Sequence, residues 1–90
     1  MPRHRKDNNH AAIQEALEKC GLKCINTSQF GSGYPDLVAI REDGRVLLVE
    51  CKGDDTPMTG AEVLFVMQLV NPCYRIFYDA EQAARSVMDG

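Results

Sequence analysis

The amino-acid sequence predicts an α/β fold in which a mixed β-sheet is flanked by helices, with the elements in the order αβββαβα. Three observations lead to this prediction. Apolar residues between positions 13 and 20 recur with helical spacing, Val46–Val49 is apolar on both faces as expected of a central strand, and capping sequences precede two later segments. A chain of 90 residues has room for one such domain.

The first predicted helix follows a basic segment. Residues 1–7 should form an N-terminal arm, and residues 8–90 a single domain. The expected start of the helix is one of three residues with good capping side chains, Asp7, Asn8 or Asn9. One buried face is indicated by apolar residues in i, i+3, i+4, i+7 spacing, namely Ile13, Ala16, Leu17 and Cys20. Gly21 suits the position at which a helix ends.

Three strands are expected next. Residues 23–27 form the first, and a loop over residues 28–34 with two glycines separates it from the second, residues 35–41. Glu42-Asp43-Gly44 has the composition of a hairpin turn, with glycine where a positive φ is needed. The third strand, residues 45–52, should therefore lie antiparallel to the second.

The C-terminal part contains a helix, a strand and a helix. A capping box over Thr59-Gly60-Ala61-Glu62 starts a second helix, which runs to about Val70 and is ended by Asn71-Pro72. Residues 73–78 form the fourth strand, and Asp79-Ala80-Glu81-Gln82 starts the final helix.

The second predicted helix is apolar around almost its whole circumference, with polar side chains only at positions 62 and 68 between residues 61 and 70. Such a helix must be buried on all sides. We expect one side to cover the sheet and the other to pack against a second copy of the chain in a homodimer. The alternative is that the final helix covers this side within one chain.

The composition is that of a globular protein outside membranes, because no apolar run approaches the roughly 20 residues needed to span a bilayer. The charged N-terminus lacks the apolar stretch of a signal peptide, so the expected location is the cytoplasm. The cysteines at positions 20, 24, 51 and 73 should then stay reduced and serve as small buried residues. The net charge of −3 argues against nucleic-acid binding, although residues 1–35 are basic on balance.

Three charged residues should converge at one edge of the predicted sheet. Asp36 opens the second strand, and Glu50 and Lys52 close the third. In an antiparallel hairpin the start of one strand lies beside the end of the other. Residues two apart in a strand face the same side, so Glu50 and Lys52 point together and Cys51 points away.

This arrangement predicts a metal-dependent active site. Two carboxylates held close together repel unless a cation lies between them, and oxygen ligands suit Mg²⁺ or Mn²⁺. Such an ion polarises phosphate and activates water, while a lysine stabilises the charge that develops. An ordinary surface ion pair is the alternative for any single Glu-x-Lys, but it does not explain the Pro35-Asp36 pair on the neighbouring strand.

Three segments together resemble the VRR-NUC domain, the virus-type replication-repair nuclease of the PD-(D/E)XK superfamily: Gly31-Ser32-Gly33-Tyr34-Pro35-Asp36-Leu37-Val38, Val46-Leu47-Leu48-Val49-Glu50-Cys51-Lys52 and Met58-Thr59-Gly60-Ala61-Glu62. The resemblance covers nearly the whole chain and is to the compact stand-alone form found in phages. It implies a restriction-endonuclease-like αβββαβ core, here with a C-terminal helix. It also implies metal-dependent endonuclease cleavage of DNA, often at Holliday junctions or flaps, in the host cytoplasm if the protein is phage-encoded.

Carried over by position, the resemblance implies that Asp36, Glu50 and the main-chain carbonyl of Cys51 hold the metal and that Lys52 is the catalytic lysine. The family usually has an acidic residue on the first helix, about three positions before an Ile-Gln pair. Here His10 stands there, on the same helix edge as Gln14, and either residue could contact a metal, its water or a phosphate. A histidine with no role is the alternative.

Two acidic residues are expected to lie outside the active site. Glu15 points nearly opposite the buried Ile13, towards solvent. Glu62 stands where the family commonly has glutamine, but the capping box already accounts for it.

The expected partner is DNA, and two segments of the chain are candidates for contact with its phosphate backbone. Glycine in the loop lets amides approach phosphate at Ser32 and Gly33, and the arm offers Arg3, Arg5 and Lys6. A plain turn and a solvated terminus are the alternatives. The competing functions are a catalytically silent DNA-binding or assembly module on the same fold, and a hydrolase of RNA.

Overall fold

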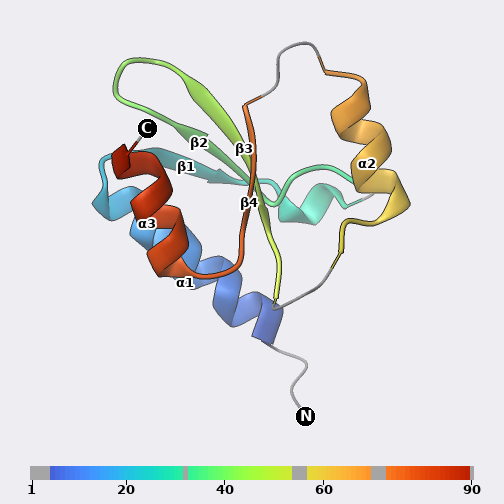
Figure 1. The fold of residues 1–90 in the computed structure, drawn as a ribbon, viewed down its shortest axis with the longest axis horizontal. Coiled ribbons are helices and arrows are strands. Elements are labelled where there is room, and N and C mark those ends of the chain that lie inside the picture. Colours follow the sequence, from blue (N-terminus) through green and yellow to red (C-terminus); the bar gives the residue numbers. More distant parts are fainter. Residues whose placement is uncertain (1–4, 32, 54–56, 70–72, 90) are drawn as a thin grey trace.

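The computed structural model describes residues 5–31, 33–53, 57–69 and 73–89. The elements follow the predicted order (Figure 1), with a short 3-10 helix η1 before the second strand. In chain order they are α1 (Arg5–Lys19), β1 (Lys23–Asn26), η1 (Ser28–Phe30), β2 (Leu37–Ile40), β3 (Val46–Cys51), α2 (Gly60–Met67), β4 (Tyr74–Phe77) and α3 (Ala80–Asp89). The predicted α/β class, with a mixed sheet and a C-terminal helix, is confirmed.

The four strands form one sheet in the order β1-β2-β3-β4. The first three are antiparallel neighbours, whereas β4 runs parallel to β3. The β2–β3 hairpin pairs Leu37 with Val49. Its turn contains Gly44 at φ 92°, and the Gly44 N–H donates to the carbonyl of Arg41 at 2.9 Å. The antiparallel hairpin that the turn predicted is therefore present.

The two faces of the sheet differ in how they are covered. Helices α1 and α3 pack against each other and cover one face (Figure 1), where the buried core lies. That core consists largely of Ile13, Leu17, Leu37, Ala39, Leu47, Val49, Cys51, Phe77, Ala83 and Val87. The other face carries the alternate side chains of β3, including Leu48 and Glu50, and α2 lies on this side.

Helix α1 begins earlier than predicted. It starts at Arg5, inside the segment expected to be an arm, so the prediction that one of residues 7–9 caps it is wrong. The side-chain amide of Asn9 instead donates to the main-chain carbonyl of Lys52, at the end of β3. The helix ends as predicted, because the N–H groups of Gly21 and Leu22 bond back to carbonyls in its last turn.

Helix α2 has the predicted capping box. The Thr59 hydroxyl accepts from the Glu62 N–H, and the Glu62 carboxylate accepts from the Thr59 N–H. The helix ends at Met67, and the predicted stop at residues 70–72 lies outside the described residues. Leu64 and Met67 are 62% and 73% exposed. Because α3 packs on α1 and β4, the alternative in which α3 covers α2 is wrong.

Within the described part of the chain, none of the helices combines the length and apolar character that crossing a membrane requires. The four cysteines form no disulfide. Cys51 is buried, Cys20 and Cys24 pack partly against the core, and Cys73 is exposed, so the expectation of burial fails for Cys73.

Candidate active site

Asp36 and Glu50 lie side by side because the β2–β3 register continues one residue past Leu37 and Val49. The Asp36 N–H donates to the carbonyl of Val49 at 3.0 Å. Its carboxylate Oδ2 accepts from the Cys51 N–H at 2.9 Å. Both acidic side chains are buried, with Asp36 6% and Glu50 1% exposed.

Lys52 completes the cluster from the same face of β3. Its ammonium Nζ lies 4.0 Å from Glu50 Oε2, and the residue is buried. Cys51 is fully buried in the core on the opposite face. Strand alternation and the hairpin therefore bring Asp36, Glu50 and Lys52 together, as the sequence predicted.

Glu62 is a fourth member of this cluster, and the expectation that it serves only as a helix cap is wrong. Its Oε1 accepts from Lys52 Nζ at 2.7 Å while also accepting from the Thr59 N–H at 2.8 Å. Both residues of the ion pair are buried. The one available signal in the sequence was the position of Glu62, because the VRR-NUC domain that the sequence resembles commonly has a glutamine there.

The cluster contains three carboxylates and one ammonium, so negative charge is in excess. Burial raises the pKa of Glu50 to about 8, with further contributions from a hydrogen bond to Glu62 and the charge of Asp36. Burial acts in the same direction on Glu62, but hydrogen bonds from Glu50, Lys52 and the Thr59 N–H lower its pKa to about 2. The proton is therefore held mainly on Glu50.

Tyr74 of β4 borders the cluster on the remaining side. Its hydroxyl lies 3.4 Å from Glu50 Oε1. Burial, followed by the negative charges of Glu50 and Glu62, raises the pKa of Tyr74 well above its usual range. The phenol therefore stays protonated and acts as a hydrogen-bond donor to Glu50.

The donor set of the cluster fits a hard divalent cation. Asp36 and Glu50 offer carboxylate oxygens, and a cation between them would relieve the repulsion between the two side chains, which adds to the effect of burial on the pKa of Glu50. Among the described residues, no group of three or more His, Cys, Asp or Glu side chains is placed to hold a metal. A Mg²⁺ ion held by these two carboxylates would take its other ligands from main-chain carbonyl and water oxygens.

The first helix approaches this site through Asn9, which the sequence did not single out as a site residue. Asn9 bonds the Lys52 carbonyl and so ties α1 to the end of β3. His10 has a buried Nε2 with no hydrogen-bond partner among the described residues. Gln14 donates to the Glu18 carboxylate at 3.1 Å within α1, which is a contact outside the cluster of Asp36, Glu50 and Lys52.

The residues predicted to contact DNA lie in the loop before β2 and at the N-terminus. Gly33 has φ 87°, and a Cβ at this position would lie 2.5 Å from the carbonyl oxygen of Ala61. Its close approach is therefore to the first turn of α2. Arg3 and Ser32 lie outside the described residues, and Arg5 and Lys6 belong to α1.

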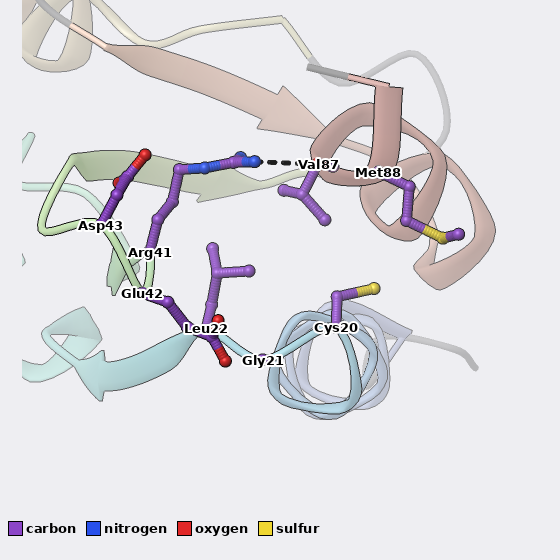
Figure 2. Close-up of a pocket in the computed structure, with 8 residues that line it drawn as sticks. All are labelled: Cys20, Gly21, Leu22, Arg41, Glu42, Asp43, Val87 and Met88. Carbon is purple, nitrogen blue, oxygen red and sulfur yellow. Dashed lines mark hydrogen bonds between the residues drawn. The ribbon is translucent and has the colours of Figure 1, made fainter.

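A cavity of about 300 Å³ lies at the other end of β2 (Figure 2), lined by Cys20, Gly21, Leu22, Arg41, Glu42, Asp43, Val87 and Met88. Arg41 crosses it and donates from Nη2 to the carbonyl of Val87 at 3.1 Å. Asp36 and Arg41 flank opposite ends of the strand, roughly 16 Å apart at about 3.3 Å per residue. The cavity is therefore separate from the acidic cluster.

Comparisons with known proteins identify the fold. No protein family model and no curated protein sequence matches the chain. A solved structure described as "VRR_NUC domain" superposes on it with a TM-score of 0.80, covering 93% of this chain and 95% of the other at 18% sequence identity. The chain therefore has the fold of a VRR_NUC domain.

Proposed function

We propose that this chain, which has the fold of a VRR_NUC domain, is a divalent-metal-dependent endodeoxyribonuclease that hydrolyses phosphodiester bonds in branched DNA such as Holliday junctions or flaps. One observation carries the proposal. Asp36 and Glu50 are buried side by side, with the Lys52 ammonium within 4.0 Å of Glu50. Mg²⁺ or Mn²⁺ is the proposed cofactor, and the cytoplasm, that of the host for a phage protein, the proposed location.

The proposed roles rest on the geometry of the cluster and, for the main-chain carbonyl of Cys51, on the resemblance to the VRR-NUC domain. Asp36, Glu50 and the main-chain carbonyl of Cys51 would hold the ion, which supplies polarisation of the phosphate and activation of water. Lys52 lies on the same face and donates hydrogen bonds to the attacking water or to a phosphate oxygen. Glu62 fixes the position of the Lys52 ammonium through the 2.7 Å contact.

The competing proposal is a catalytically silent module that binds DNA or assembles complexes. Burying three carboxylates and an ammonium costs folding free energy unless each group is paired. A surface that only binds an anionic polymer gains nothing from buried carboxylates, which repel phosphate. The intact cluster therefore favours catalysis over binding alone.

A homodimer would suit a branched substrate. The exposed Val63, Leu64 and Met67 of α2 form an apolar surface that a second copy would bury. Two active sites would then stand at a fixed separation, as symmetric incision of a four-way junction requires.

The test is a panel of linear, flap, four-way-junction and RNA substrates, incubated with pure protein and with Mg²⁺, Mn²⁺ or EDTA. We expect cleavage of branched DNA that needs the metal and is abolished by Glu50→Gln or Asp36→Asn. Glu15→Gln, an exposed acid on α1, is the matched control and should cleave normally. Normal turnover by either site variant would contradict the assignment, and cleavage of RNA alone would identify a ribonuclease.

A further inference from the structure

Three arginines converge on a small cavity away from the acidic cluster. Arg41, Arg45 and Arg75 line a space of about 70 Å³ together with Leu47, Cys73 and Ser86. The described residues that line the cavity include no acidic residue, although the Asp43 carboxylate lies beside it and pairs with Arg45. The positive charge of these arginines is opposite in sign to the net charge of the chain, which is −3.

In the described part of the chain, each guanidinium donates one side-chain hydrogen bond and keeps most of its donors. Arg41 Nη2 donates to the Val87 carbonyl at 3.1 Å, and Arg75 Nη1 donates to the Tyr74 carbonyl at 3.1 Å. Arg45 Nε pairs with Asp43 Oδ2 at 2.8 Å. A guanidinium carries five N–H donors, so these contacts orient the side chains without consuming their capacity to bind. Asp43 offsets only part of the combined charge.

The chemistry of the cavity matches a phosphate group. Arginine's planar fork donates paired hydrogen bonds to phosphate oxygens. The space exceeds the roughly 30 Å³ that a single water occupies in the liquid, so it admits a group of several atoms. Three like charges brought together repel one another, and a bound anion removes that repulsion.

The cavity faces away from the proposed cleavage site. Arg75 pairs with Val49 in the β3–β4 register, and its side chain therefore lies on the α3 face of the sheet, opposite Glu50. Arg45 immediately precedes β3, whereas Glu50 is near its other end, roughly 17 Å away at about 3.3 Å per residue. A phosphate in this cavity is therefore not the phosphate that is cleaved.

We propose that Arg41, Arg45 and Arg75 form a second phosphate site, which binds the backbone of another arm of the same branched DNA. This inference rests on the proposed function. Because Arg75 lies on the edge strand β4, we expect a straight duplex across Asp36 and Glu50 to stay on the α2 face and a second arm of a branched substrate to reach this cavity around β4. The site would thereby increase the affinity for branched DNA relative to linear DNA.

The test is binding of a four-way junction and of a linear duplex in EDTA, where no cleavage occurs, over a range of salt concentrations. The variant is Arg45→Gln/Arg75→Gln, which spares Arg41 because Arg41 holds the C-terminal end of α3. Arg85→Gln is the control, because Arg85 is exposed and pairs with Glu81 outside the cavity. We expect junction affinity to fall by about tenfold and its log–log salt slope to shrink by about 2, with linear-duplex affinity nearly unchanged.

Equal losses on both DNAs, or no loss on the junction, would overturn the second-arm site. Should the double glutamine variant fail to fold, Arg45→Lys/Arg75→Lys decides, because it keeps the charge and removes the paired donors. If this lysine variant binds the junction more weakly with the same salt slope as the wild type, the result supports the site. If its affinity for the junction equals that of the wild type, the result overturns the site. Failure of the wild-type chain to cleave any DNA would instead refute the proposed function, which this binding measurement does not use.

Discussion

At the scale of single residues, the site depends on where one proton resides. Glu50 has Asp36 and Glu62 as acidic neighbours and Lys52 as the balancing cation. Burial and these acids favour its neutral form, whereas the hydrogen bonds to Glu62 favour the charged form of that residue. The metal-free chain thus folds with Glu50 protonated over a range where an exposed glutamate is ionised.

This proton makes the stability of the metal-free protein depend on pH. The pKa of Glu50 rises from an ordinary 4.5 to about 8 on folding, so the folded state binds the proton more tightly. The resulting stabilisation is complete below about pH 4.5 and is lost as the pH rises towards 8. Glu62 acts in the opposite direction, because folding lowers its pKa from 4.5 to about 2. Its contribution to stability is complete above about pH 4.5 and is lost as the pH falls towards 2.

We therefore expect the melting temperature in EDTA to fall between about pH 5 and pH 8, and Glu50→Gln to abolish most of that fall. Thermal melts followed by circular dichroism measure this directly. Glu15→Gln, a change at an exposed acid of α1, should keep the wild-type slope. A wild-type melting temperature that is flat or rises over this range would contradict the account.

Glu62 should act as a positioning residue for Lys52. Glu62→Ala removes both the ion pair and the capping acceptor, and we expect a loss of about 1–3 kcal/mol in stability and at least a tenfold fall in kcat with KM little changed. Glu62→Gln keeps an oxygen that can accept from Lys52 Nζ and from the Thr59 N–H, so it should restore most of the stability and most of kcat. Glu81→Ala, at an exposed acid in the first turn of α3, is the control. If glutamine rescues stability but not kcat, the charge of Glu62 itself takes part in the reaction.

The sequence predicted Asp36, Glu50 and Lys52 because strand alternation and a hairpin turn are local and fix which side chains meet. It did not predict the roles of Glu62 and Asn9. Both reach the cluster from helices whose placement against the sheet depends on packing between distant segments. The sequence suggested a capping role for both residues. Glu62 does take part in the capping box of α2, whereas Asn9 lies inside α1 and does not cap it.

At the scale of elements, α2 decides whether the cluster is complete. Its first turn lies against Gly33, where a Cβ would meet the backbone of Ala61. The ring of Phe65 packs edge-on against Tyr34, with centroids 5.3 Å apart. The loop before β2 therefore holds the helix that brings Glu62 to Lys52.

Gly33→Ala should loosen this contact. We expect it to destabilise the fold by about 1–3 kcal/mol more than Gly31→Ala, because both glycines have positive φ but only Gly33 lacks space for a methyl group. Chemical denaturation of the two variants measures the difference. Cleavage should fall with Gly33→Ala even under conditions in which the variant is fully folded, since Glu62 shifts with α2. Equal stability of the two variants would show that the approach to Ala61 is not tight.

Element boundaries differ from prediction by one or two residues at most strand ends. β2 was expected over residues 35–41 and spans Leu37–Ile40, while β3 was expected over 45–52 and spans Val46–Cys51. The sequence marks where apolar alternation stops, but the last ladder hydrogen bond depends on the neighbouring strand. The difference is larger at the start of α1, which was expected after one of residues 7–9 and lies at Arg5. Residues 5–9 contain no apolar side chain that would mark a buried helical face.

At the scale of the whole molecule, the two faces of the sheet are unequally protected. Two helices cover the face with the buried core, whereas α2 leaves Val63, Leu64 and Met67 exposed on its own side. Ile25 and Val46 are also exposed apolar residues. A surface of this kind favours association.

We expect the protein to sediment as a homodimer at micromolar concentration and Leu64→Gln/Met67→Gln to sediment as a monomer. Removing two exposed apolar side chains costs the monomer little, whereas it removes several kcal/mol of burial from an interface. Met88→Gln, at an equally exposed methionine of α3, should leave the dimer intact. A wild-type mass of one chain at every concentration would refute the dimer.

The hairpin also has a consequence for the order in which the chain folds. Asp36 and Cys51 lie 15 positions apart with Gly44 at the turn between them, so we expect the strands to pair from the turn outwards and the acidic end to pair last. Hairpins form in roughly 1–10 μs, and repulsion between Asp36 and Glu50 acts only once those final pairs meet. Interactions that form late change the rate of unfolding more than the rate of folding. A cation bound between the two carboxylates should therefore lengthen the lifetime of the folded molecule while leaving the speed at which it forms almost unchanged.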